Sequence, residues 1–228
     1  MSPGIRALVW DENGAHVPRA VYPQGIRGAL AGALAQSGRF QLEPAHLDEP
    51  EQGLPPARLD AAEVLLWWGH RRHAELADGR VAELVARVHA GRLGLLALHS
   101  GHHSKPFRQA LGASGDLGGG WDEDGGPEQV RVCAPWHPVA EGVQDFELAA
   151  EELYAAPFHV PPPEAVIVQS FFPRHGKGFP SGLVWRAAEG RVAYLRFGHE
   201  SCPSLHHPMV QRLIANAAAW AAGAQRRQ

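Results

Sequence analysis

The stretch Leu93-Gly94-Leu95-Leu96-Ala97-Leu98-His99-Ser100-Gly101-His102 decides the fold, because an apolar run ends abruptly there in a polar turn that carries histidines. A run that is apolar along its whole length is typical of a strand buried on both faces of a parallel sheet. Residues 5–10 and 64–68 have the same character and end at Asp11 and at Gly69-His70. The pattern therefore predicts neighbouring parallel strands that deliver polar side chains at their carboxyl ends.

Amphipathic helices separate these strands along the sequence. Residues 25–37 place apolar side chains on one face, and residues 78–91 do the same with Asp78 as the expected N-cap. Residues 192–197 predict another core strand, and residues 208–222 predict a final helix. This alternation predicts an α/β fold with a doubly wound, mostly parallel open sheet covered by helices on both faces.

The middle of the chain has a different pattern. Short β-like runs alternate there with proline-rich loops, which predicts an antiparallel extension of the sheet. The β-like runs are residues 129–133, 165–170 and 182–185. Residues 118–126 are rich in Gly, Asp and Glu and predict a mobile surface loop. No shift in composition separates two halves, so residues 1–228 are expected to form a single domain.

Composition excludes several classes of protein. Apolar residues make up 45% and charged residues 20% of the chain, which is typical of a globular enzyme. The net charge of −3 offers no basic surface, so nucleic acid is not an expected partner. No apolar run is long enough to cross a membrane, and residues 1–5 lack the layout of a signal peptide. A cytoplasmic protein is expected, with Cys133 and Cys202 reduced.

Histidine stands out, with 14 residues that fall partly in groups. His70, His99 with His102, and His199 with Glu200 each follow a predicted strand. Ligands of open α/β sheets bind beyond the carboxyl ends of the strands, so we expect these side chains to converge in one pocket. Each group also has a structural explanation. His70 or His73 could cap the next helix, and His103, His206 and His207 could be surface residues or could support the elbow. His16, His46, His89 and His175 are expected to be structural or exposed.

Residues 95–103 have the shape of a strand-to-helix elbow, which exposes one side chain above the sheet. They resemble the elbow of class I glutamine amidotransferases, with His99 in place of the cysteine. Residues 196–200 resemble the segment that completes the amidotransferase triad, with the histidine displaced by one. Without a thiolate no acyl-enzyme can form, so amidotransferase chemistry is not expected. Ser100 lacks the flanking glycine pattern of a hydrolase nucleophile.

Several multi-residue motifs, in order and spread over nearly the whole chain, resemble the trehalose-utilisation (ThuA-like) family. These are Val21-Tyr22-Pro23-Gln24-Gly25-Ile26, Leu47-Asp48-Glu49-Pro50, Trp67-Trp68-Gly69-His70 with His73, Leu98-His99-Ser100-Gly101-His102 with Ser104-Lys105 and Phe107, Glu151-Glu152-Leu153-Tyr154 with Pro157-Phe158, and Gly198-His199-Glu200 with Pro203. Residues 112–121 depart from the family pattern. The resemblance implies a single ThuA-like domain over residues 1–228, with a fold that is flavodoxin-like or class I glutamine-amidotransferase-like. It also implies a role on trehalose-like sugars or their 3-keto derivatives.

The sequence and this resemblance together give a set of expected site residues. Expected catalytic residues are His99, His199, Glu200 and Glu152. Expected substrate-binding residues are Ser100, His102, Lys105 and Tyr154. Expected ligands of a divalent metal such as zinc are His70, His99 and His199, because imidazole-rich ligation favours zinc. No nucleotide cofactor is expected. The expected partners are a sugar substrate and a sugar oxidoreductase that acts in the same process, and the chain is expected to form a homo-oligomer.

Two functions remain open on these grounds. One is an enzyme that removes a proton next to the carbonyl of a 3-keto disaccharide and then isomerises the sugar or cleaves its glycosidic bond. The other is a non-catalytic sugar-binding or scaffold partner of a sugar dehydrogenase, in which Trp67, Trp68, Trp121 and Trp185 supply stacking faces for sugar rings. Burial in the core is the competing explanation for Trp67 and Trp68.

Overall fold

The computed structural model describes residues 4–223 and contains one large mixed sheet. Its strand order is β2-β1-β3-β4-β11-β10-β9-β6-β7. The first five strands in this order run parallel to one another, and the remaining pairs are antiparallel. The parallel strands are β1 (Ile5–Asp11), β2 (Phe40–His46), β3 (Val64–Trp68), β4 (Gly94–Leu98) and β11 (Gly190–Leu195). The predicted mostly parallel α/β sheet is therefore confirmed.

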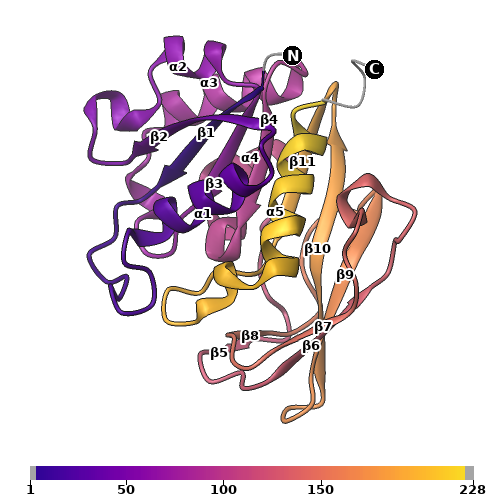
Figure 1. Ribbon diagram of the computed structural model, residues 1–228. Coiled ribbons are helices and arrows are strands. Elements are labelled where there is room, and N and C mark those ends of the chain that lie inside the picture. The colour runs from indigo at the N-terminus through magenta and orange to yellow at the C-terminus, as the bar shows by residue number, and fades with distance from the viewer. Residues whose placement is uncertain (1–3, 224–228) are drawn as a thin grey trace.

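Helices cover both faces of the parallel part of the sheet (Figure 1). One apolar core lies between the sheet and the helices α1 (Gly25–Gln36) and α5 (Pro208–Ala221). The second core lies on the opposite face, under α2 (Pro56–Ala61), α3 (Asp78–His89) and α4 (Lys105–Leu111). Trp67 and Trp68 point into these two different cores, as neighbouring residues of a strand must. Both indoles are buried, which agrees with the explanation that they pack in the core.

The antiparallel extension is longer and more connected than the sequence indicated. It consists of β6 (Glu128–Val132), β7 (Phe146–Leu148), β9 (Ala165–Phe172) and β10 (Lys177–Ala187). A separate two-stranded ribbon, β5 (Trp121–Asp122) with β8 (Leu153–Tyr154), lies at the lower end of the molecule in Figure 1. The glycine-rich segment expected to be a surface loop thus contains a short paired strand.

Local details differ from the expectations in three places. Strand β2 was not predicted, because it is an edge strand with Pro44 inside it and a mostly accessible surface. Asp78 is not the N-cap of α3: Ala77 holds that position, and the Asp78 carboxylate forms an ion pair with Lys105 instead. Neither His70 nor His73 caps this helix. Within the described residues, no helix is both long and apolar enough to span a membrane.

Gly190 and Gly32 give a matched test of the packing between β11 and α3. A Cβ atom on Gly190 would stand 1.8 Å from the backbone oxygen of Val88, the last turn of α3, whereas one on Gly32 in α1 would meet nothing within 4 Å. We expect Gly190→Ala to lower the free energy of unfolding by about 2–3 kcal/mol, because the backbone must shift. Gly32→Ala should raise it by roughly 0.5–1 kcal/mol. Urea unfolding of both variants checks this, and equal effects would contradict the packing described.

Candidate active site

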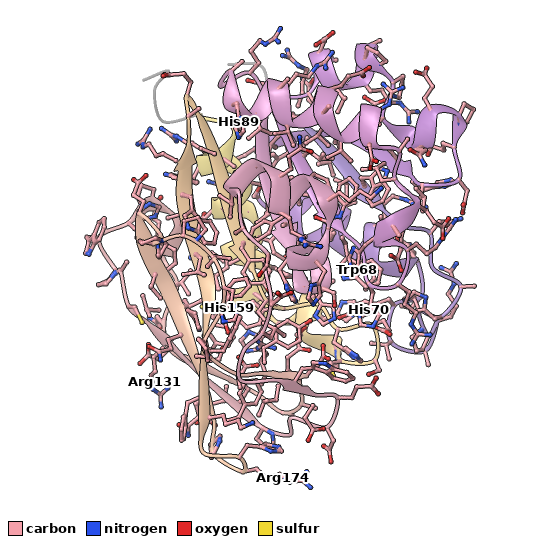
Figure 2. The ribbon with its side chains drawn as sticks, turned by 180° about the vertical axis from the view of Figure 1, so that it is seen from behind. Trp68, His70, His89, Arg131, His159 and Arg174 are labelled. Carbon is pink, nitrogen blue, oxygen red and sulfur yellow. The ribbon has the colours of Figure 1, made fainter. Side chains whose placement is uncertain are left out.

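Three histidines from three parallel strands meet at the carboxyl edge of the sheet. His70 follows β3, His99 follows β4, and His199 lies four residues beyond the end of β11. The ring centroids of His70 and His99 are 5.2 Å apart, those of His99 and His199 5.2 Å, and those of His70 and His199 5.7 Å. Figure 2 shows His70 beside Trp68, where the helix-covered part of the molecule meets the β extension. We call these three imidazoles, together with Glu152 and Glu200, the histidine cluster.

His99 occupies the elbow after β4 with a left-handed backbone, at a φ of 52°. Such a φ is unfavourable for a residue with a β-carbon, so the surrounding structure must hold it in place. Tyr194 does so by donating its hydroxyl hydrogen to the carbonyl oxygen of His99 at 3.0 Å. The His99 ring is fully buried, and its Nδ1 lies 3.3 Å from the carbonyl oxygen of Arg196. Because a carbonyl can only accept, Nδ1 carries the ring proton and Nε2 presents a lone pair to the cluster.

Two carboxylates face these rings. The Glu152 Oε2 atom lies 3.3 Å from His99 Nε2, and the Glu200 carboxylate lies 3.7 Å from His70 Nε2 and 3.6 Å from His199 Nε2. Among the described residues, Glu152 Oε2, Glu200 Oε2 and His199 Nε2 are buried atoms without a hydrogen-bond partner. Buried polar atoms are normally paired with protein, water or a ligand, so this group of unpaired atoms marks the candidate binding site.

The backbone amide of Ser201 sets the tautomer of His199. This N–H donates to His199 Nδ1 at 3.3 Å, and the Ser201 hydroxyl lies 2.8 Å from the same atom. Since Nδ1 accepts, Nε2 of the neutral ring carries the proton. The cluster therefore places a hydrogen-bond acceptor, the Nε2 lone pair of His99, beside a hydrogen-bond donor, the Nε2–H group of His199.

Burial shifts the pKa values of the three imidazoles and of Glu152 toward their neutral forms. Burial lowers the pKa of His99 well below its usual value, and the neighbouring His199 and His70 lower it further. Burial raises the pKa of Glu152 to about 8, and the adjacent Glu151 contributes to the increase. Near pH 7 the cluster therefore combines a neutral imidazole base with a protonated carboxyl group, an arrangement suited to moving protons.

Glu12 was not predicted as a site residue, although it directly follows β1 at the same edge of the sheet. Its buried carboxylate accepts backbone N–H groups from His70 at 2.8 Å, Arg71 at 3.0 Å and Arg72 at 2.9 Å. These bonds fix the loop that carries His70. His16, expected to be structural or exposed, lies 3.6 Å from Glu12 and 3.9 Å from Glu200. Examining every strand end, and not only those with histidine, would have found Glu12.

Arg196 was also missed, because a charged residue directly after β11 appeared to be part of the strand. The guanidinium is fully buried and forms an ion pair with the equally buried Glu128. It donates to the carbonyl oxygen of Glu152 at 2.7 Å and to the hydroxyl of Ser181 at 3.0 Å. Arg196 thus holds the chain at Glu152 through its side chain and the ring of His99 through its own carbonyl oxygen.

The four expected substrate-binding residues have different positions. Ser100 Oγ lies 2.9 Å from His70 Nδ1 and 3.0 Å from the hydroxyl of Tyr154, so these two expected residues border the cluster. His102 packs edge-on against Tyr154, with its Nδ1 2.6 Å from the carbonyl oxygen of Gly115. Lys105 is not brought into the site: its ammonium group donates to the carbonyl oxygen of Leu76 and to Asp78, both at 2.7 Å. Lys105 instead ties the start of α4 to the start of α3.

His102 makes stability depend on pH in a definite direction. Burial lowers the pKa of His102 to about 3, whereas the unfolded chain binds this proton near the ordinary value of 6.5. Below pH 6.5 the unfolded state therefore binds more protons, so this contribution to stability is full above 6.5 and is lost as the pH falls toward 3. We expect the stability of the wild type relative to His102→Asn to decrease by up to about 1.4 kcal/mol for each pH unit below 6.5. Urea unfolding at several pH values checks this, and a constant difference would contradict it.

Comparison with known proteins gives a family match and several structural likenesses. The model of the trehalose-utilisation family, ThuA, matches residues 6–221. A ThuA-like protein of Parabacteroides merdae is 17% identical, covers 97% of this chain and 91% of its own, and superposes with a TM-score of 0.74. A cytoplasmic protein of Salmonella typhimurium LT2 is 13% identical over 95% of this chain and 99% of its own, with a TM-score of 0.64.

A glutamine amidotransferase of Thermotoga maritima is more distant. It is 10% identical over 96% of this chain and 99% of its own, with a TM-score of 0.55. At these identities the likenesses show the fold alone, which is the α/β fold that glutamine amidotransferases also have. No individual protein of curated function matches the sequence significantly.

Proposed function

Because this chain belongs to the trehalose-utilisation (ThuA) family, whose name implies a role in sugar utilisation, we propose that it is an enzyme acting on trehalose-like disaccharides that carry a ketone at C3. The observation that carries the proposal is the histidine cluster, in which His99 Nε2 offers a lone pair beside the unpaired proton donors of His199 and Glu152. A ketone acidifies the neighbouring C–H bond, and proton abstraction next to a carbonyl needs this combination of base and donors.

His99 is the proposed base. Its Nε2 atom accepts the proton from C2 of the sugar, and the electron pair of that C–H bond moves toward the ketone to give an enediolate. The depressed pKa of His99 keeps this nitrogen unprotonated at neutral pH. A weakly basic imidazole would be a poor base in water, but here the base is held in a buried site where no solvent has to reorganise around the reacting groups.

The N–H of His199 and the carboxyl group of Glu152 are the proposed donors to the enediolate oxygens. A buried donor is effective here because no solvent has to reorganise as the negative charge develops. Two outcomes follow from the same enediolate. Return of the proton to C3 isomerises the sugar. Alternatively, the electron pair forms a C1=C2 double bond as the C1–O bond breaks, and the departing glycosidic oxygen takes the proton from His99, which cleaves the glycosidic bond.

The donor set also fits a divalent cation. His99, Glu152 and His199 form one group of possible ligands, and His70, His199 and Glu200 form another, with the ligand atoms of each group within 4.8 Å of one another. Two imidazoles and one carboxylate are a common ligand set of catalytic zinc, which when bound polarises a carbonyl oxygen. Such binding would require the other tautomer of His199 and would displace the proton of Glu152, so we expect titration with Zn²⁺ to release about one proton near pH 7.

The proposed substrate requires an earlier oxidation, because trehalose itself has a hydroxyl group at C3 and no acidic C–H bond. A sugar oxidoreductase is therefore the proposed functional partner. The test is to incubate the purified protein with a 3-keto disaccharide, with and without Zn²⁺, and to follow the sugar by NMR. Conversion well above the uncatalysed rate is the expected result. No conversion with any of several divalent cations would overturn the proposal.

A further inference from the structure

The ribbon formed by β5 and β8 carries one wall of the site. Trp121 of β5 pairs with Tyr154 of β8 in antiparallel register. Residues paired in this way point their side chains to the same face of the ribbon. The Tyr154 hydroxyl lies 3.0 Å from Ser100 Oγ, which borders the histidine cluster. The Trp121 side chain is therefore on the face of the ribbon that is directed toward the cluster.

The indole of Trp121 is 62% exposed, although the backbone beneath it is fixed. Backbone hydrogen bonds join this segment to the chain around Tyr154: Gly119 N–H donates to Ala155 O at 3.2 Å, and Ala155 N–H donates to Gly120 O at 3.0 Å. A Cβ atom on Gly119 would stand 2.3 Å from the carbonyl oxygen of Ala156, so glycine is needed for this close approach. The glycine-rich segment therefore fixes the backbone that carries the exposed Trp121 side chain.

Glu123 follows β5 in a bend of the chain, two residues after Trp121, and is exposed. An exposed indole next to an exposed carboxylate presents an apolar surface and a hydrogen-bond acceptor. A pyranose ring offers the complementary pair, an apolar face of C–H groups and a rim of hydroxyl donors.

We propose that Trp121 and Glu123 form a sugar-binding subsite that holds the second pyranose ring of a disaccharide while the first ring lies in the histidine cluster. This inference rests on the proposed function for the position of the reacting ring. It makes the chain selective for disaccharides over monosaccharides, because only a second ring reaches the indole.

Calorimetric titration with trehalose and with glucose tests the subsite without requiring turnover. We expect Trp121→Ala to weaken trehalose binding at least about tenfold and glucose binding less than about twofold, because only the second ring of the disaccharide loses its apolar contact with the indole. Trp121→Phe should retain part of the affinity. The matched control is Trp136→Ala, because Trp136 is 73% exposed on the loop after β6 and should leave trehalose binding unchanged.

The outcomes separate this inference from the proposed function. Equal trehalose binding by the wild type and Trp121→Ala would overturn the subsite, as would an absence of trehalose binding to the wild type at millimolar concentration. Trp121-dependent binding of trehalose without conversion of any 3-keto disaccharide would instead support the subsite and contradict the enzymatic proposal.

Discussion

Replacing His99 with asparagine is expected to lower the rate of 3-keto disaccharide conversion by at least about 100-fold, the usual contribution of a positioned general base. Asparagine tolerates a positive φ, so the elbow at 52° should keep its backbone conformation. The variant removes the Nε2 lone pair that faces Glu152 and leaves the other cluster residues in place. Steady-state kinetics should show the loss in kcat, with a smaller change in KM.

The matched control is His103→Asn, four residues further along the same turn. His103 is exposed, and its loss should leave the rate within about twofold of the wild type, as for most surface substitutions. Circular dichroism and urea unfolding of His99→Asn establish that the variant is folded. A folded His99→Asn that keeps the wild-type kcat would contradict the role of His99 as the base.

Replacing Arg196 with methionine is expected to lower the free energy of unfolding by about 3–5 kcal/mol. Methionine fills much of the same volume but leaves the carboxylate of Glu128 buried without its partner. Removing one member of a buried ion pair is costly because the remaining charge has neither water nor a counter-ion. The measurement is urea unfolding at neutral pH.

The double variant Arg196→Met with Glu128→Gln separates the charge effect from packing. If the unpaired charge causes the loss, the double variant should recover at least half of it, because no buried charge remains. An Arg196→Met variant within about 1 kcal/mol of the wild type would show that water reaches Glu128, against the burial seen here. A double variant as unstable as the single one would assign the loss to packing.

The apolar strands were predictable because their periodicity reports burial on both faces. Residues 64–68 form β3 at the predicted bounds, and the final helix ends within one residue of its predicted end. The convergence of His70, His99 and His199 followed from one rule of parallel sheets, that the carboxyl ends of the strands lie along one edge. The extent of the antiparallel extension was less predictable, because its strands are short and its register depends on long-range pairing.

The residues that hold the site residues in place could not be predicted from the sequence. Arg196 and Glu128 are far apart along the chain, and the successive pairing of β6 with β9, of β9 with β10 and of β10 with β11 brings them together. Lys105 shows a different limit: its place beside the histidine turn was compatible with a helix-face charge or a substrate contact, and in the structure its side chain pairs with Asp78. Sequence proximity to a catalytic turn does not fix the direction of a side chain.

Solvent deuterium exchange measures the proposed proton transfer most directly. The wild type is incubated with a 3-keto disaccharide in D₂O, and NMR follows C2 and C3 of the keto sugar. The proposed mechanism predicts deuterium at C2 of recovered substrate or at C3 of the isomerised product, formed at least about 100-fold faster than with His99→Asn. Conversion without deuterium at these carbons, or exchange at the same rate with His99→Asn, would contradict proton abstraction by the histidine cluster.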